Sequence, residues 1–382
     1  MFNRIIVVSA IMFTLTTCIA SAGDYEMRKD GGFRSARIVF IGDSLTDGFT
    51  WPMFVRQALS EAGKDVPAFI NDASGGDTAG ERLACLDQAA LKYEPTMAII
   101  LLGGGNDASK KRTPEQYAAD LDEMITRLKA NKTTVVMLSG SFPGPKHHLK
   151  AKGPNPYRVQ LRTIAQKHAV QLIDTEDAMR RAWGLGIWLW EADQGHLNVD
   201  GCRVIARAVL DGLGYADVLL PEKLKIEPLP GLVREWKMKA VEKGAPPLDE
   251  KTVAGIRPDG SWKTLALPES EPQENWWMDQ VRQEGYALST DKLIGKADTY
   301  LGIAAIRRSH VRADKDGQAF LNTGAHLKTV WLNGKLVYRT TGWTGFHAGK
   351  ERIPIQLKAG DNTLVIETGG QFALNITEDL LW

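Results

Sequence analysis

The sequence predicts an α/β domain built on a parallel sheet, followed by a smaller all-β domain. Strand-like and helix-like stretches alternate from residue 37 to about residue 219, as in βαβ units with helices on both faces of a parallel sheet. Helix signals largely vanish after Trp262, where short β-like runs follow one another closely. A chain of 382 residues is also too long for one ordinary core, so two or three domains are expected.

The stretch 37–48, RIVFIGDSLTDG, is the centre of the first domain. Its apolar run at 38–41 has no alternation, which indicates a strand buried on both faces, and a helical pattern follows at 51–59. Ser44 therefore lies where a central strand meets a helix, at the edge of an α/β sheet that binds ligands. This position makes Ser44 a candidate nucleophile; the alternative interpretation of this stretch is that Ser44 only caps the following helix.

The remaining elements of this domain follow in order. We expect strands at 67–70, 97–102, 133–139 and 170–174, and helices at 79–93, 113–130, 157–168 and 198–212. Polar, glycine-rich loops at 71–78 and 103–107 follow two of the strands, and Pro114 stands at the first position of a helix. Polar side chains are thus expected at the carboxyl ends of several neighbouring strands.

The first 22 residues have the pattern of a secretory signal peptide. Arg4 precedes an apolar run at 5–13, and Ala20-Ser21-Ala22 forms an A-x-A cleavage site before Gly23. We expect an exported, periplasmic or extracellular protein cleaved near Ala22; an uncleaved anchor and a lipoprotein signal at Cys18 are the competing interpretations. Export would leave Cys85 and Cys202 as the mature cysteines, either paired or separately unpaired.

After residue 220 the amino-acid composition and the pattern of the chain change. Residues 221–260 carry several prolines and many charges, with one helix-like piece at 233–241, and we interpret them as a linker or bracing segment. Residues 261–382 are predicted as a β-sandwich. The β-like runs there lie at 326–332, 335–338, 352–357 and 363–367, divided by turns such as Asn333-Gly334. The preceding domain is bounded at 23–220.

The loops of the first domain together supply the groups that ester hydrolysis needs. Such a reaction needs a nucleophile, a base, a group that orients the base, and donors for the oxyanion. In Asp193-x-x-His196 the spacing brings a carboxylate to the imidazole Nδ1 and leaves Nε2 free to face Ser44. Gly76 lets a backbone N–H approach a ligand closely, and the Asn106 amide is an uncharged donor.

These four blocks resemble, in order, those of the SGNH (GDSL) hydrolases: Gly42-Asp43-Ser44-Leu45, Gly76-Asp77-Thr78, Gly104-Gly105-Asn106-Asp107 and Asp193-x-x-His196. The spacing is similar to that of the thioesterase I and lysophospholipase branch. The resemblance covers about residues 37–215 and implies a flavodoxin-like three-layer α/β/α sandwich. It further implies Ser44 as nucleophile, His196 as base and Asp193 as its orienter, with an oxyanion hole from the Ser44 and Gly76 N–H groups and the Asn106 side chain. One departure is Leu197, where many relatives have proline.

Each block alone is also compatible with an ordinary structural role. Asp193 alone is compatible with capping a turn, and His196 with an interior histidine, whereas four blocks in the right order favour catalysis. His147 and His148 follow a loop rich in proline and glycine, and either line the substrate cleft or are simply solvated. No cluster has the spacing of a structural zinc site, and the chemistry requires no metal or cofactor.

The second domain indicates a carbohydrate substrate. The segments 330–335 and 357–364 resemble the galactose-binding-like jelly rolls attached to secreted glycosidases and carbohydrate esterases. Seven of the 11 tryptophans lie beyond residue 230, where they either form a sugar-binding surface or fill the core of the sandwich.

We therefore predict a secreted serine esterase that removes O-acyl groups, above all acetyl, from carbohydrate. A lipolytic thioesterase or lysophospholipase is the alternative enzyme, and a non-catalytic secreted glycan-binding protein is the alternative of another class. A net charge of +1 gives no sign of a nucleic-acid partner, and no stable membrane anchor is expected.

Overall fold

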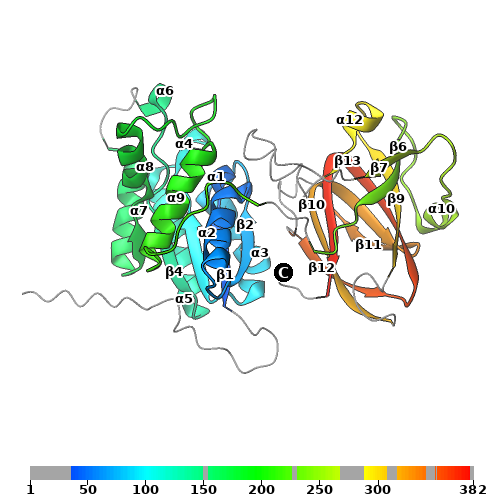
Figure 1. Cartoon of the computed structure of the whole chain (residues 1–382), viewed down its shortest axis with the longest axis horizontal. Coiled ribbons are helices and arrows are strands. Elements are labelled where there is room, and N and C mark those ends of the chain that lie inside the picture. The colour runs from blue at the N-terminus through cyan, green and yellow to red at the C-terminus, as the bar shows by residue number, and fades with distance from the viewer. Residues whose placement is uncertain are drawn as a thin grey trace, which may run out of the picture.

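The computed structural model describes residues 36–148, 154–225, 230–266, 288–307, 316–340, 349 and 351–378. Figure 1 shows two lobes, an α/β lobe at the left and a β lobe at the right. The predicted signal peptide lies outside the described residues. No helix in these ranges has both the length and the apolar character that crossing a membrane requires.

The α/β lobe is built on a five-stranded sheet in which every neighbouring pair is parallel. Its strands are β1 (Arg37–Gly42), β2 (Ala68–Ala73), β3 (Met97–Leu101), β4 (Thr134–Leu138) and β5 (Gln171–Ile173). The order β2-β1-β3-β4-β5 is the flavodoxin-like order, so the predicted fold class is confirmed. β1 lies inside the sheet, between β2 and β3, as expected for an unbroken apolar run.

Helices cover both faces of this sheet. They are α1 (Ser44–Asp47), α2 (Thr50–Glu61), α3 (Ala79–Ala89), α4 (Gly105–Ser109), α5 (Pro114–Ala130), α6 (Pro145–His148), α7 (Pro156–Lys167), α8 (Thr175–Gly184) and α9 (Val199–Gly212), with the 3-10 turn η1 (Leu91–Tyr93). Ile38 and Phe40 pack with α2, α8 and α9, whereas Val39 and Ile41 pack with α3, α5 and α7. Alternate residues of β1 therefore serve two separate cores, because successive strand side chains point to opposite faces.

Local signals account for two of the helix starts. Thr78 caps α3 and Thr113 caps α5, each in a reciprocal capping box, and Pro114 occupies the first position of α5 as predicted. The sequence reading contained no element at α8, which the structure places directly after β5. Asp174 caps this helix through the N–H of Asp177.

The second lobe is an antiparallel sheet, as predicted. Its strands are β6 (Glu235–Ala240), β7 (Lys263–Ala266), β8 (Leu288–Ser289), β9 (Tyr300–Arg307), β10 (Gly317–Leu332), β11 (Lys335–Arg339), β12 (Glu351–Leu357) and β13 (Asp361–Thr377), with α10 (Glu250–Gly255) and α12 (Asp291–Ile294) beside them. Among the described residues these strands form one sheet ordered β11-β10-β13-β9-β6-β7, with β12 on β10 and β8 on β13. The jelly-roll topology remains a prediction.

One element differs from the sequence prediction. The prediction of a helix-like piece at 233–241 is wrong, because Glu235–Ala240 is strand β6, paired with β7 and β9. Trp236 and Met238 are buried while their neighbours Glu235 and Lys237 are exposed, a period of two that fits a half-buried strand. The segment interpreted as a linker thus contributes a strand to the second sheet.

The tryptophans of this lobe that the structure describes fill its core. Trp236, Trp262 and Trp331 are buried, and the Trp236 indole N–H donates to the carbonyl of Val233 at 2.9 Å. Trp276, Trp277, Trp343 and Trp382 lie outside the described residues. Core packing is therefore the correct interpretation for the first three.

A contact between the two lobes lies at the end of the parallel sheet opposite Ser44. The Arg352 guanidinium of β12 lies 5.3 Å from the ring centroid of Tyr93 in η1. Since η1 precedes the start of β3, this contact is at the amino ends of the strands. Cys85 and Cys202 are unpaired; Cys85 is exposed on α3 and Cys202 is buried on α9.

Candidate active site

Ser44 stands at the carboxyl end of β1, as the sequence predicts. The strand passes through Asp43 into α1, and the Asp43 carboxylate accepts a hydrogen bond from the N–H of Leu45 at 3.0 Å. This bond caps the helix, so capping is the work of Asp43 rather than of Ser44. The Ser44 hydroxyl is thereby available to other groups.

Asp193 and His196 meet Ser44 in one chain of hydrogen bonds. His196 Nε2 lies 2.9 Å from Ser44 Oγ, and His196 Nδ1 lies 2.5 Å from Asp193 Oδ2. The three residues come from two places 152 positions apart, since Ser44 follows β1 and the other two belong to the turn before α9. The structure therefore brings the three predicted residues together in the predicted order.

The turn that carries the pair is partly solvated. The side chain of Asp193 is 53% exposed and that of His196 33%. Partial burial by itself raises the pKa of the Asp193 carboxyl. The N–H groups of His196 and Gly195 and the His196 ring outweigh that effect, and together they lower this pKa to about 2. Asp193 is consequently a carboxylate at neutral pH.

Two backbone donors lie open beside Ser44. Gly76 has a φ of +83°, a conformation that residues with a side chain rarely adopt. The space where a Cβ would lie is open. The Gly75 N–H donates to Asp47 Oδ2 at 2.8 Å, whereas the N–H groups of Ser44 and Gly76 donate to no described residue. This difference makes Gly76, rather than Gly75, the open donor of this loop.

The Asn106 amide is already engaged. Its Nδ2 donates to the carbonyl of Asp77 at 2.9 Å and lies 3.4 Å from Asp43 Oδ2. The second contact is long, so one N–H of this amide is only weakly held. Asn106 thus lies against the loop that carries Gly76 and retains a donor for a further acceptor.

Buried charges that the sequence reading did not single out hold the Gly76 loop. Arg82 on α3 binds Asp72 at 2.9 Å and Asp77 at 2.6 Å, and the Asp47 carboxylate holds Gly75. Asp47, Asp72 and Arg82 are all buried, although charged residues are seldom buried unless paired. No local pattern marked these residues, because Asp72 and Asp77 lie in a stretch that the sequence predicts to be a polar loop.

Asp43 is a further group that the motif contains but the prediction left without a role. Burial raises the pKa of its carboxyl to about 6, against the opposing effects of the Leu45 N–H and of His196. Asp43 therefore changes charge in the range where Asp193 is already fully ionised.

Comparison with known proteins agrees with this arrangement. Residues 40–204 match the sequence model of the family described as "GDSL-like Lipase/Acylhydrolase family". This range contains Ser44, Gly76, Asn106, Asp193 and His196. Residues 40–204 form a GDSL-like hydrolase domain.

Two relatives match part of this hydrolase domain. An arylesterase from Vibrio mimicus is 34% identical over 115 residues, which is 28% of this chain and 56% of that protein. Esterase TesA from Pseudomonas aeruginosa is 26% identical over 119 residues, covering 29% of this chain and 58% of that protein. The matched regions thus span little more than half the length of each relative.

Solved structures also resemble the hydrolase domain. An acetyl xylan esterase from Geobacillus stearothermophilus has a TM-score of 0.43 at 19% identity, covering 47% of this chain and 95% of its own. A lipase/acylhydrolase from Enterococcus faecalis has a TM-score of 0.42 at 21% identity, covering 49% of this chain and 100% of its own.

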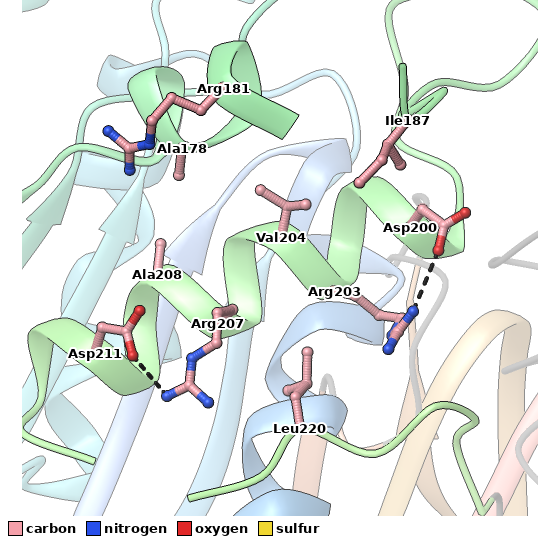
Figure 2. A pocket seen from close by; sticks show the side chains of 10 residues that line it. All are labelled: Ala178, Arg181, Ile187, Asp200, Arg203, Val204, Arg207, Ala208, Asp211 and Leu220. Atoms are coloured by element: carbon pink, nitrogen blue, oxygen red, sulfur yellow. Dashed lines mark hydrogen bonds and ion pairs between the residues drawn. The ribbon is translucent and has the colours of Figure 1, made fainter. Parts of the chain in front are cut away.

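A separate groove of about 450 Å³ runs between α8 and α9 of the hydrolase domain (Figure 2). Its charged walls are internally paired, because Arg203 binds Asp200 at 3.4 Å and Arg207 binds Asp211 at 2.7 Å. The arginines are therefore neutralised within their own helix. Within the described residues, no three His, Cys, Asp or Glu side chains gather as metal ligands would.

Proposed function

We propose that the protein is a serine ester hydrolase that acts on carboxylic esters through an acyl-enzyme. The observation that carries the proposal is the continuous chain of hydrogen bonds from Asp193 through His196 to Ser44. A proton relay to a serine nucleophile needs this order, with a base beside the hydroxyl and a carboxylate that orients the base.

In the proposed reaction, Ser44 Oγ attacks the ester carbonyl carbon while His196 Nε2 accepts the hydroxyl proton. The resulting imidazolium is stabilised by the ionised Asp193 and then gives its proton to the departing alcohol. Water attacks the acyl-enzyme in the second half, with His196 again taking and returning a proton. The free acid and Ser44 are regenerated.

The negative oxygen of each tetrahedral intermediate would be bound by the Ser44 and Gly76 N–H groups and by Asn106. The two N–H groups are open in the structure, and the amide has one weakly held donor. Fixed donors of this kind stabilise charge as it develops, and they need little reorganisation in the transition state.

We assign an O-acyl group on carbohydrate, above all O-acetyl, as the substrate. The support is the resemblance of the second domain to galactose-binding-like jelly rolls and the antiparallel sheet found there. The buried Trp236, Trp262 and Trp331 provide no sugar-binding surface, so a glycan would contact other side chains of this lobe or the hydrolase domain alone.

One observation favours a lipolytic alternative. Leu185, Ile187 and Trp188 are large apolar residues exposed on the loop that leads from α8 to Asp193, and Trp188 is 47% exposed. Exposed apolar groups on the same loop as Asp193 suit an acyl chain or an aryl leaving group.

Hydrolysis of p-nitrophenyl esters from acetate to laurate tests the proposal, comparing the mature protein with Ser44→Ala. Acetate turnover that disappears in the variant supports the esterase and directs the next assay to acetylated polysaccharides. A preference for laurate supports the lipolytic alternative. Absence of turnover, together with glycan binding, would favour the non-catalytic glycan-binding protein.

We further propose that residues 1–22 direct export and are removed. N-terminal sequencing of the protein recovered from the periplasm or medium is expected to begin at Gly23. A mature protein that begins at Met1 would contradict cleavage.

A further inference from the structure

The turn that carries Asp193 and His196 combines bonds of its own with support from outside. Within it, the Glu191 N–H donates to the His196 carbonyl at 2.9 Å, the Gln194 N–H donates to the Glu191 carbonyl at 2.9 Å, and the N–H groups of Gly195 and His196 donate to Asp193 Oδ1. Gln194 has a φ of +59°, in the left-handed region that residues other than glycine seldom adopt. A conformation of this kind persists where neighbouring structure holds it.

That support comes from residues 142–147, here named the 142–147 loop, which follow β4 and include the first three residues of the short helix α6. The Gly144 N–H donates to the Gln194 carbonyl at 3.1 Å, and the Lys146 N–H donates to Gln194 Oε1 at 2.7 Å. At the base of the turn, the Trp190 indole N–H donates to the Phe142 carbonyl at 2.8 Å. The base of the turn at Trp190 and its middle at Gln194 are therefore bound to one loop.

His147 of this loop contacts the backbone of Asp193 itself. Its Nε2 lies 3.1 Å from the Asp193 carbonyl oxygen, and because a carbonyl only accepts, Nε2 must carry the proton. The Asp193 carboxylate meanwhile binds the His196 ring. Any shift of the Asp193 backbone therefore changes the distance that aligns His196 with Ser44.

The fit leaves no room for a side chain at Gly144. A Cβ at that position would lie 2.6 Å from Gln194 Cβ and 2.9 Å from the Gln194 carbonyl oxygen. Contacts this short would force either the loop or the turn to move.

From these contacts we propose that the 142–147 loop sets the geometry of the Asp193–His196 pair, with His147 and Gly144 as positioning residues. The inference rests on the proposed function, since it assigns a role in the same site. Besides the packing of the Phe142 ring against Trp190, whose centroids lie 6.2 Å apart, the two segments meet through hydrogen bonds directed at the turn.

The first test compares His147→Ala and His147→Gln. Loss of the ring is expected to lower kcat by about 10-fold with little change in KM. A small displacement of the His196 ring misaligns the reacting groups without removing substrate contacts. The glutamine amide can donate to the same carbonyl, so His147→Gln should restore most of kcat. His168→Ala is the matched control, since the His168 ring also makes a hydrogen bond, to Asp122 at 2.7 Å on α5.

The second test compares Gly144→Ala with Gly184→Ala, where an added Cβ meets open space. Gly144→Ala should lower kcat more than His147→Ala does, and Gly184→Ala should leave it unchanged. A purely structural role would instead lower the melting temperature without separating kcat from KM.

A spectroscopic readout distinguishes failure of this inference from failure of the esterase proposal. The Nδ1 proton between His196 and Asp193 should give a low-field proton NMR resonance that weakens in His147→Ala and Gly144→Ala and returns in His147→Gln. Because it arises from the pair itself, this signal tests the loop even where ester turnover is absent. An unchanged resonance in both variants, or kcat within about twofold of wild type in both, would overturn the inference.

Discussion

The two halves of the candidate site are held by different means. The proton-transfer half, Asp193 and His196, lies on a partly solvated turn whose carboxylate is 53% exposed. The oxyanion half is made of the Gly76 loop, which ion pairs of the buried Arg82 hold, and of Asn106 in α4. The exposed half has to be aligned by hydrogen bonds from a neighbouring loop, whereas the buried half is aligned by charges in a low-dielectric interior.

This difference predicts how substitutions in each half affect activity and stability. Removing a group of the proton-transfer half removes chemistry and leaves the fold intact, because its side chains are partly solvated. Removing a group of the oxyanion half also disturbs buried polar contacts, so activity and stability should change together.

The largest effect is expected in the proton-transfer half. Asp193→Asn should lower kcat by about 10⁴-fold, because the amide holds the His196 ring in the wrong tautomer. Steady-state kinetics on p-nitrophenyl acetate measure this, with Asp200→Asn on α9 as control. A loss below about 10-fold would remove Asp193 from the relay.

In the oxyanion half, Asn106→Ala should lower kcat by about 10²- to 10³-fold with a small change in KM. The variant should also lose stability, since the Asp77 carbonyl loses its donor. Kinetics and urea unfolding measure the two effects, with Asn131→Ala, at the far end of α5, as control. Unchanged kcat would reject an oxyanion role for this amide.

Asp43 links the oxyanion half to pH. Burial raises the pKa of its carboxyl from the usual 3.8 to about 6, so the folded protein binds this proton more tightly than the unfolded chain. The stabilising contribution is fully present below pH 3.8 and is lost as the pH rises through 6.

The wild type should therefore lose about 3 kcal/mol across this pH range relative to Asp43→Asn, which has no proton to lose. Urea unfolding of both proteins at the two ends of the range measures the difference. Parallel stability curves for the two proteins would show that Asp43 has an ordinary pKa.

The smallest effect is expected at the helix cap behind the Gly76 loop. Thr78→Ala should cost about 1 kcal/mol of stability through loss of the α3 capping box. Thr113→Ala removes the equivalent box of α5, so both variants should lose similar stability. Thermal unfolding measures this, and kcat should fall more in Thr78→Ala, whose cap follows Gly76 and Asp77. Equal kcat in the two variants would show that the α3 cap does not affect the geometry of the site.

The sequence predicted much of the hydrolase domain because its signals are local. The unbroken run 38–41 indicated a strand buried on both faces, and Thr113-Pro114 indicated the start of α5. The segment 233–241 was misread because a short amphipathic stretch fits two periods, and only pairing with β7 and β9 selects the strand.

By itself, the sequence determined most elements of the first domain, the parallel sheet and the identity of Ser44, Asp193 and His196 as candidates. These follow from periodicity, caps and motif spacing, which are properties of short stretches. Only the tertiary structure decided that Gly76 rather than Gly75 has the open N–H, that buried Asp47 and Arg82 hold that loop, and that His147 reaches Asp193. Such contacts join residues far apart in the chain, and no local pattern encodes the distance between them.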